Sequence, residues 1–316
     1  MKLSEFAGYG DKLEQLMRSV QAGRIVHALL LSGPKGSGKR TAARLFAQTL
    51  LCRGADKPCG VCPACKRFLA GTHPDVELLR PEKKSIGVGE IRALVDKLSM
   101  KTYEGGRRVV IIEQAETMTA AAQNALLKTL ENPVGDAMFF LVTDAPGALL
   151  STIESRCQAV RFRDLSVEEC AGVLERRGVE PAKARRLAGM AQGSVGRALA
   201  LDGDEDYARL REEVLASLEA LSDPASVATA AAPLEADKNG DGPILEIMEA
   251  WARDLMAVQC GGTPYQSDAL DRLRRSRVDG EALLKAVFTA RRQRAANVAW
   301  NNVLENMYFR IAGGRA

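Results

Sequence analysis

The strongest constraint on the fold is a glycine-rich loop that joins a short apolar segment to an amphipathic one. Residues 33–41 are Gly-Pro-Lys-Gly-Ser-Gly-Lys-Arg-Thr. The apolar run before them, residues 27–32, is typical of a buried strand, and apolar residues recur at helical spacing after them. Strand, glycine loop and helix in this order form a P-loop, in which backbone N–H groups and a helix N-terminus cradle phosphate. The candidate ligands of ATP or ADP are Gly33, Gly36, Gly38, Lys39 and Thr41.

One position of this loop departs from the P-loop pattern. The pattern has Ser or Thr directly after the lysine, and that hydroxyl ligates Mg²⁺. Here Arg40 follows Lys39, and the first hydroxyl comes one residue late, at Thr41. Two interpretations follow. Either the loop holds nucleotide without cleaving it, or it is vestigial, with Arg40 pointing outward or filling the metal position with its own charge.

The segments after the loop predict an α/β parallel-sheet core. Short apolar runs at 76–79, 109–112 and 138–142 alternate with helical patterns at 88–98 and 118–130. Strands that alternate with helices form a parallel sheet covered on both faces. Beyond residue 163 the strand pattern stops, and an acidic, glycine-containing break at 201–206 divides the helical remainder. The predicted domains are 1–164, 165–204 and 205–316.

The run at 109–112 is followed by residues that bear on hydrolysis. We expect this strand to lie next to the strand of the P-loop and its last acid, Glu113, to hold a water of Mg²⁺. Gln114 stands where a general base is needed, and a neutral amide cannot accept a proton at neutral pH. Unless Glu116 takes over this role, the sequence predicts no hydrolysis of ATP.

Four cysteines lie within fourteen residues directly after the P-loop helix. Cys52, Cys59, Cys62 and Cys65 have the spacing C-x₆-C-x₂-C-x₂-C, with Gly and Pro residues between them. Four thiolates suit a closed, tetrahedral, structural Zn²⁺ site. We therefore predict a zinc insert at 52–65, with free cysteines in a helical hairpin or an iron–sulfur cluster as the alternatives.

A single arginine, Arg156, directly follows a short helix that we predict at 149–155. It precedes an apolar run at 159–162. Arginine in such a place can be offered to a neighbouring molecule, where its fork binds phosphate oxygens. Taken alone, however, an arginine at a helix end is more often a partner of the helix dipole or a member of a surface ion pair.

Several of these segments together resemble one family. Residues 33–39, the four-cysteine insert, Gly71-Thr-His-Pro-Asp75, the run Asn124–Asn132 and Ser155-Arg-Cys157 occur in this order in bacterial clamp-loader subunits of the AAA+ class. The resemblance covers about residues 25–163 closely and the helical remainder more loosely. It is closest to the delta-prime family of DNA polymerase III.

The gamma/tau family is the competing resemblance, and three departures argue against it. That family has Thr where this chain has Arg40, and an Asp-Glu pair where this chain has Glu113-Gln114. It also has an arginine in a Gly-Ser-x-Arg run, which is displaced by one here, in Gly193-Ser-Val-Gly196-Arg197. The alternative function is nevertheless a gamma/tau-like ATPase that uses Lys39, Thr41 and Glu113.

The delta-prime resemblance implies an AAA+ core, a small helical lid and a helical collar that closes a five-subunit ring. It implies that Arg156 is an arginine finger for the ATP site of a neighbouring gamma/tau subunit, and that this chain does not hydrolyse ATP itself. The implied partners are gamma/tau and delta subunits and, through the complex, the sliding clamp and primer-template DNA.

Composition adds limits to these expectations. The 316 residues carry a net charge of +4, which is too mild to indicate nucleic-acid binding by itself. No apolar run approaches the ~20 residues that span a bilayer, so we expect a cytoplasmic protein without membrane contact. A DNA-binding module remains a third hypothesis because of clustered arginines: Arg272, Arg274, Arg275, Arg277, Arg291, Arg292 and Arg294.

Overall fold

The computed structural model describes residues 2–3, 5–22, 27–82, 84–103, 106–132, 135–235 and 241–313. The chain forms two compact units. The first comprises Met1–Leu165 with Ser194–Gly196, and the second Ser166–Gly193 with Arg197–Ala316. The division into three domains at 1–164, 165–204 and 205–316 stays a prediction.

The first unit is an α/β core. Its strands are β1 (Ala28–Ser32), β2 (Val76–Leu79), β3 (Arg108–Glu113), β4 (Ala137–Thr143) and β5 (Gln158–Arg161). Its helices are α1 (Gly10–Gln21), α2 (Lys39–Leu51), α3 (Pro63–Leu69), α4 (Val88–Leu98), α5 (Ala120–Glu131) and α6 (Ser151–Glu154), with 3₁₀ turns η1 (Ala115–Thr117) and η2 (Pro146–Ala148). Every strand predicted from an apolar run is present.

The five strands form one parallel sheet in the order β2-β3-β4-β1-β5. The expectation that the strand ending in Glu113 lies beside the P-loop strand is therefore wrong. β3 pairs with β2 and β4, and β4 lies between it and β1. Sequence order cannot reveal this, because the crossover helices let consecutive strands skip a position in a parallel sheet.

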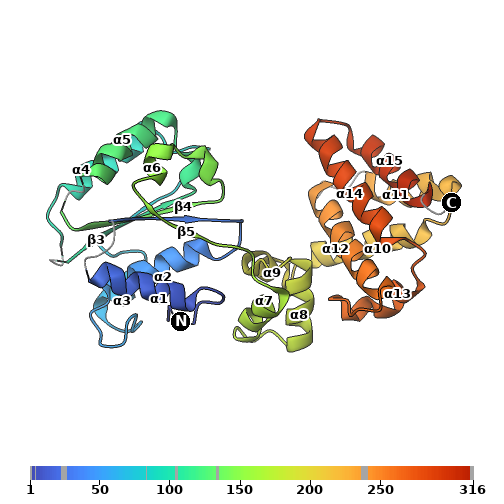
Figure 1. Ribbon diagram of the computed structural model, residues 1–316, viewed down its shortest axis with the longest axis horizontal. Coiled ribbons are helices and arrows are strands. Elements are labelled where there is room, and N and C mark those ends of the chain that lie inside the picture. The colour runs from blue at the N-terminus through green and yellow to red at the C-terminus, as the bar shows by residue number, and fades with distance from the viewer. Residues whose placement is uncertain are drawn as a thin grey trace. The chain divides into compact units, whose positions relative to one another are not determined.

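The two faces of the sheet are covered by different helices. Alternate residues of each strand point to opposite faces, so Val110 and Phe139 join the cluster formed with α4 and α5, which also contains Leu126. On the other face, the ring of Phe140 packs 5.6 Å from that of Phe46 of α2. Figure 1 shows α4, α5 and α6 on one face and α1, α2 and α3 on the other.

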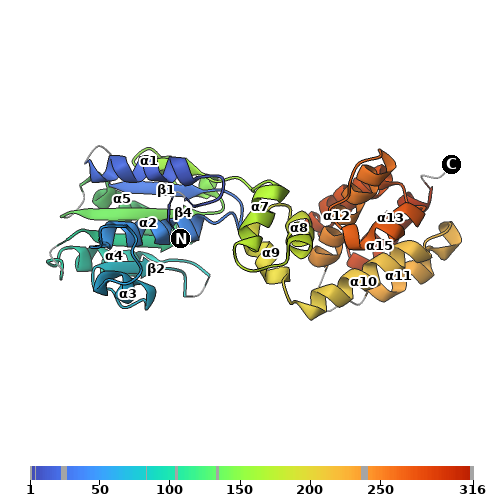
Figure 2. The same cartoon turned by 90° about the horizontal axis from the view of Figure 1, so that it is seen from below.

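The second unit is helical throughout its described part. It contains α7 (Val167–Glu175), α8 (Pro181–Met190), α9 (Val195–Leu201) from Arg197 onward, α10 (Glu205–Ala220), α11 (Val227–Glu235), α12 (Asp241–Gln259), α13 (Leu270–Arg275), α14 (Gly280–Ala295) and α15 (Trp300–Gly313), with 3₁₀ turns η3 (Pro224–Ser226) and η4 (Ser267–Ala269). Figure 2 shows α10 and α11 side by side, together with α12, α13 and α15. The predicted α/β parallel-sheet core followed by helical regions is thus confirmed.

Local sequence explains how the second unit begins and how its core closes. Ser166 and Glu169 form a capping box in which each side chain accepts a hydrogen bond from the other's backbone N–H. In the core, the fully buried Tyr308 hydroxyl is 2.6 Å from Ser217 Oγ. Burial raises the pKa of Tyr308.

No helix of the described ranges has the length and apolar composition needed to cross a membrane.

Gly33 fixes the junction between β1 and the end of β5. Its φ is +144°, and a Cβ placed on it would lie 2.2 Å from the carbonyl oxygen of Phe162. Phe162 in turn donates its N–H to Ser32 O at 2.7 Å. Only a residue without a Cβ lets the phosphate loop leave the sheet at this point.

We expect Gly33→Ala to destabilise the protein by about 2–5 kcal/mol, because it adds backbone strain to an overpacked contact. Gly71→Ala is the matched control, since Gly71 also has a positive φ (+71°) but open space around it. The control should lose only about 1–2 kcal/mol. Urea unfolding of both variants measures the difference, and equal losses would contradict this explanation of Gly33.

Candidate functional site

The phosphate loop has the geometry that its sequence predicts. α2 begins at Lys39, and its N-cap Gly38 has a φ of +90°. Gly36 also has a positive φ, +83°, and Ser37 donates its N–H to Pro34 O at 3.3 Å. The loop therefore turns directly into the N-terminus of a 13-residue helix, where unpaired N–H groups favour an anion.

The lysine of the loop already has an anionic partner. Lys39 is only 4% exposed, and its Nζ lies 2.8 Å from Oδ1 of Asp144, which directly follows β4. The ammonium also donates to the carbonyl oxygen of Pro34 at 2.6 Å and to Ser37 Oγ at 3.3 Å. These three contacts match the three donors of an ammonium group.

Arg40, which stands where the P-loop pattern has Ser or Thr, also has a charged partner. Glu113 ends β3 with its side chain 3% exposed. Its Oε2 lies 3.1 Å from Nε of Arg40, and its Oε1 lies 3.2 Å from Nη2 of Arg44. Arg40 and Arg44 are four residues apart and therefore lie on the same face of α2. Glu113 thus offers both carboxylate oxygens to guanidinium groups.

The remaining residues predicted to bear on hydrolysis are Gln114, Glu116 and Thr41. Gln114 is exposed and has a φ of +54°, and Glu116 lies within η1 and is half-buried. Thr41 is exposed on the first turn of α2.

Two other segments of the first unit cover the loop. The ring of Phe6 lies so close to Gly38 that a Cβ there would be 2.9 Å from Cζ of the ring. On another side, Gly196 donates its N–H to Gly36 O at 3.2 Å, and Ser194 Oγ donates to Lys35 O at 3.3 Å. The loop is therefore packed against protein on at least two sides.

The structure brings the four predicted cysteines together. The sulfur atoms of Cys52, Cys59, Cys62 and Cys65 all lie within 4.8 Å of one another. Tetrahedral Zn²⁺ with Zn–S bonds of about 2.3 Å requires sulfurs about 3.8 Å apart. Gly54 leaves the space for this cluster, because a Cβ on it would lie 2.9 Å from Cys59 Sγ. The cluster can hold a metal ion.

Backbone N–H groups point at the cysteine sulfurs. Cys59 N–H donates to Cys52 Sγ at 3.3 Å, Cys62 N–H to Cys59 Sγ at 3.3 Å, and Cys65 N–H to Cys62 Sγ at 3.4 Å. Such bonds favour thiolates, and the one from Cys65 is the main cause that lowers the pKa of Cys62 to about 6. Burial instead raises the pKa of Cys65 to about 12. A metal ion would supply the positive charge that this last thiol needs to ionise.

Arg156 lies on the turn after α6, just before the edge strand β5. Its Nη2 is 2.5 Å from Oε1 of Glu131, the last residue of α5, and its Nη1 donates to Thr152 O at 2.9 Å. The side chain is 34% exposed. α6 lies over the same face of the sheet as α5 (Figure 1). The arginine thus has a local carboxylate partner and is accessible from solvent.

Three of the seven arginines that suggested a DNA-binding module pair with acids of the second unit. Arg272 pairs with Glu212 and Glu219, the shortest distances being 2.6 and 2.7 Å. Arg291 pairs with Glu249 and Arg294 with Asp241, both at 2.5 Å. These pairs lower the net positive charge that this cluster of arginines would present to a DNA backbone, and so weaken the case for direct DNA binding.

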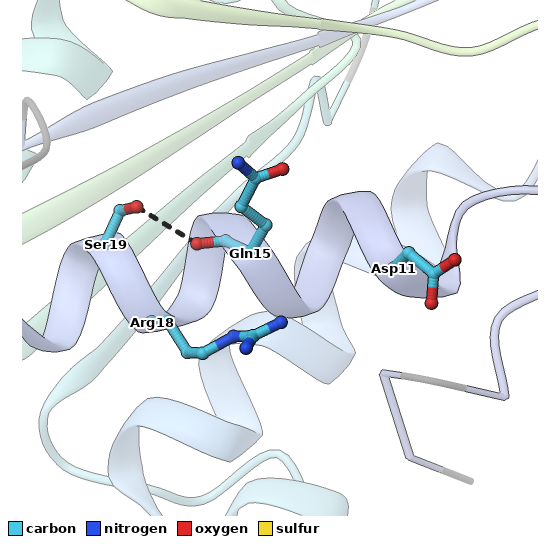
Figure 3. A pocket seen from close by; sticks show the side chains of 4 residues that line it. All are labelled: Asp11, Gln15, Arg18 and Ser19. Atoms are coloured by element: carbon cyan, nitrogen blue, oxygen red, sulfur yellow. Dashed lines mark hydrogen bonds between the residues drawn. The ribbon is translucent and has the colours of Figure 1, made fainter.

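A surface hollow runs along α1 and is lined by Asp11, Gln15, Arg18 and Ser19 (Figure 3). Ser19 Oγ donates to Gln15 O at 3.0 Å within the helix. The lining belongs to a single helix and includes no residue of the phosphate loop, the cysteine cluster or the Arg156 turn. The hollow therefore adds nothing to the candidate site.

Sequence reasoning missed Asp144, Arg44 and Glu131. The carboxyl ends of parallel strands meet at one edge of a sheet, so the acid after β4 could have been expected near the phosphate loop. Arg44 could have been found by its spacing from Arg40. No local pattern signals Glu131, because its contact with Arg156 depends on the packing of α5 against α6.

Comparison with known proteins identifies relatives along nearly the whole chain. The family described as "DNA polymerase III, delta subunit" matches residues 9–166. DNA polymerase III subunit delta′ of Bacillus subtilis (strain 168) is 31% identical over 315 residues, which cover 96% of this chain and 95% of that protein. Subunit delta′ of Escherichia coli (strain K12) is 40% identical over 203 residues, 62% of this chain and 60% of that one.

Tau subunits are also among the relatives of this chain. DNA polymerase III subunit tau of Bacillus subtilis (strain 168) is 33% identical over 208 residues, which cover 63% of this chain and 37% of that protein. The delta′ match extends over nearly all of both chains, whereas the tau match does not. This chain therefore belongs to the delta′ family of DNA polymerase III subunits.

Proposed function

We propose that this chain is a non-hydrolysing subunit of the DNA polymerase III clamp loader. It would stand in a hetero-pentameric ring with gamma/tau and delta subunits and help to load the sliding clamp on primed DNA in the cytoplasm. Its own contribution to catalysis would be Arg156, offered as an arginine finger to the ATP bound by a neighbouring gamma/tau subunit.

The pairing of Arg40 and Arg44 with Glu113 is the observation that carries the first half of this proposal. In P-loop ATPases, hydrolysis requires Mg²⁺ held by the loop hydroxyl and by an acid at a strand end. In this chain the hydroxyl position holds Arg40, and both oxygens of Glu113 have guanidinium partners. Gln114 adds a neutral amide where a base would act. Each of these features argues against hydrolysis by this chain.

The surroundings of Arg156 support the second half. The guanidinium is at the surface, and its partner Glu131 is 44% exposed. An exposed ion pair contributes only about 0–1 kcal/mol, so a neighbouring triphosphate could replace Glu131 at little cost. The planar fork suits bidentate contact with phosphate oxygens and remains charged at every physiological pH.

The gamma/tau-like ATPase remains the second candidate, and Lys39 favours it. The loop lysine and all three loop glycines are present, and the tau relative of Bacillus subtilis is 33% identical over 208 residues. This candidate requires Arg40 and Arg44 to leave Glu113 so that Mg²⁺ can bind between Glu113 and Thr41.

For the cysteine cluster we propose a structural Zn²⁺ ion held by Cys52, Cys59, Cys62 and Cys65. Four protein ligands leave no open position for water, so the ion would hold the insert together rather than take part in a reaction. α2 ends at Leu51, one residue before the first ligand. Zinc would therefore anchor the end of the helix whose start carries the phosphate loop.

We expect Arg156→Ala to lower ATP turnover in a clamp loader reconstituted with gamma/tau and delta subunits. An arginine finger raises the rate of hydrolysis about 10³- to 10⁵-fold at the ATP site that it serves. One ATP site of the ring should therefore lose its activity while the other sites keep theirs. Arg156→Lys should behave in nearly the same way, because it keeps the charge but loses the fork.

Arg107→Ala is the matched control for this experiment. Arg107 also forms a surface ion pair in the first unit, with Asp136 at 2.8 Å. Its loss should leave turnover unchanged. Normal turnover with Arg156→Ala, in a complex that assembles normally, would refute the finger role.

We expect purified protein to contain about one zinc per chain and Cys59→Ser to lose most of it, because a hydroxyl is a poor replacement for a thiolate ligand. Cys260→Ser is the control, since Cys260 is exposed and far from the cluster in sequence. Elemental analysis measures both. Zinc-free wild-type protein, or iron in its place, would contradict the assignment.

A further inference from the structure

We propose that the phosphate loop of this chain is closed by its own side chains: Asp144 stands in for a phosphate on Lys39, and Arg40 stands in for Mg²⁺ on Glu113. The loop would then be a structural element whose own ion pairs occupy the positions of phosphate and Mg²⁺, and it would not bind and release Mg-nucleotide. This inference deepens the proposed lack of hydrolysis, on which it rests, and extends it to nucleotide binding.

Lys39 carries the first substitution, in which Asp144 takes the place of a phosphate. Its ammonium group is buried, and a buried charge requires a partner of opposite sign. Asp144 provides that partner at 2.8 Å, and Pro34 O and Ser37 Oγ take the other two donors. A nucleotide phosphate could bind Lys39 only by displacing the carboxylate. Because Lys39 is 4% exposed, its ion pair is screened less by water and salt than the pair of Arg156 and Glu131, whose side chains are 34% and 44% exposed.

Glu113 carries the second substitution, in which Arg40 takes the place of Mg²⁺. Mg²⁺ is bound by oxygen atoms in octahedral geometry. Arg40 replaces the hydroxyl oxygen with a group that has only donors, and Arg44 takes the second oxygen of Glu113 at 3.2 Å. The residues around Glu113 therefore do not fit Mg²⁺. They fit a permanent cation supplied by the chain.

The packing of the loop agrees with a closed site. Phe6 lies against Gly38, and Ser194 and Gly196 hydrogen-bond to the carbonyl groups of Lys35 and Gly36. A Cβ on Gly196 would lie 3.0 Å from Cα of Gly36. Phe6 on one side and residues 194–196 on another therefore hold the loop in place.

The test is calorimetric titration of the full chain with ADP, once with Mg²⁺ and once with EDTA. The wild-type chain should bind weakly and equally under both conditions. Asp144→Asn should bind at least about 10-fold more tightly, because it removes the charge that competes for Lys39 while Asn keeps the shape of the side chain. The gain should be the same with Mg²⁺ and with EDTA.

Asp136→Asn is the matched control because Asp136 directly precedes β4, whereas Asp144 directly follows it, and Asp136 pairs with Arg107 instead of Lys39. This control should bind ADP as the wild type does. A second variant, Arg40→Thr, tests the replacement of Mg²⁺ by Arg40 and restores the hydroxyl of the P-loop pattern. It keeps Arg44 as the partner of the buried Glu113 carboxylate, so the experiment stays decisive if Asp144→Asn does not fold. Its binding of ADP should be strengthened by Mg²⁺ about 10-fold or more, unlike that of the wild type.

Two results would overturn the inference. One is wild-type binding of ADP that Mg²⁺ strengthens 10-fold, and the other is a folded Asp144→Asn chain that binds no more tightly than wild type. Tight Mg-nucleotide binding without turnover would refute the inference and leave the proposed function intact. Turnover by the isolated chain would refute both.

Discussion

The ion pairs between Glu113 and the arginines of α2 are the interaction on which this account depends. They join the end of β3 to the first turns of the helix that follows the phosphate loop, and they place positive charge where an ATPase would hold Mg²⁺. Glu113 is buried, so removing its partners would leave an uncompensated charge, which is strongly destabilising. These ion pairs are therefore part of what holds the fold together.

α2 connects two separate chemical sites of the first unit. Its N-terminus carries the phosphate loop, and its C-terminus passes directly into Cys52 of the cysteine cluster. The 13 residues span about 20 Å at 1.5 Å per residue. The two sites therefore cannot share ligands, and each can be perturbed without direct contact with the other. Arg156 is at a third place, on the turn before β5.

Much of the fold could be predicted from local patterns, because the buried strands are short apolar runs and the phosphate loop has fixed spacing. The helix at 88–98 was also predicted from such a signal. The order of the strands was not, and the expected neighbour of β1 was wrong. The four cysteines were found by spacing alone, but the partners of Lys39, Arg40 and Arg156 come from distant segments that only the folded chain brings together.

The account is tested most directly by steady-state ATP hydrolysis of the purified chain alone, measured with Mg²⁺ and primed DNA. With Glu113 held by guanidinium groups and Gln114 in place of a base, the predicted rate equals the background without protein and does not respond to DNA. Hydrolysis that DNA stimulates would mean that the arginines release Glu113 to a metal ion, and it would contradict the central claim.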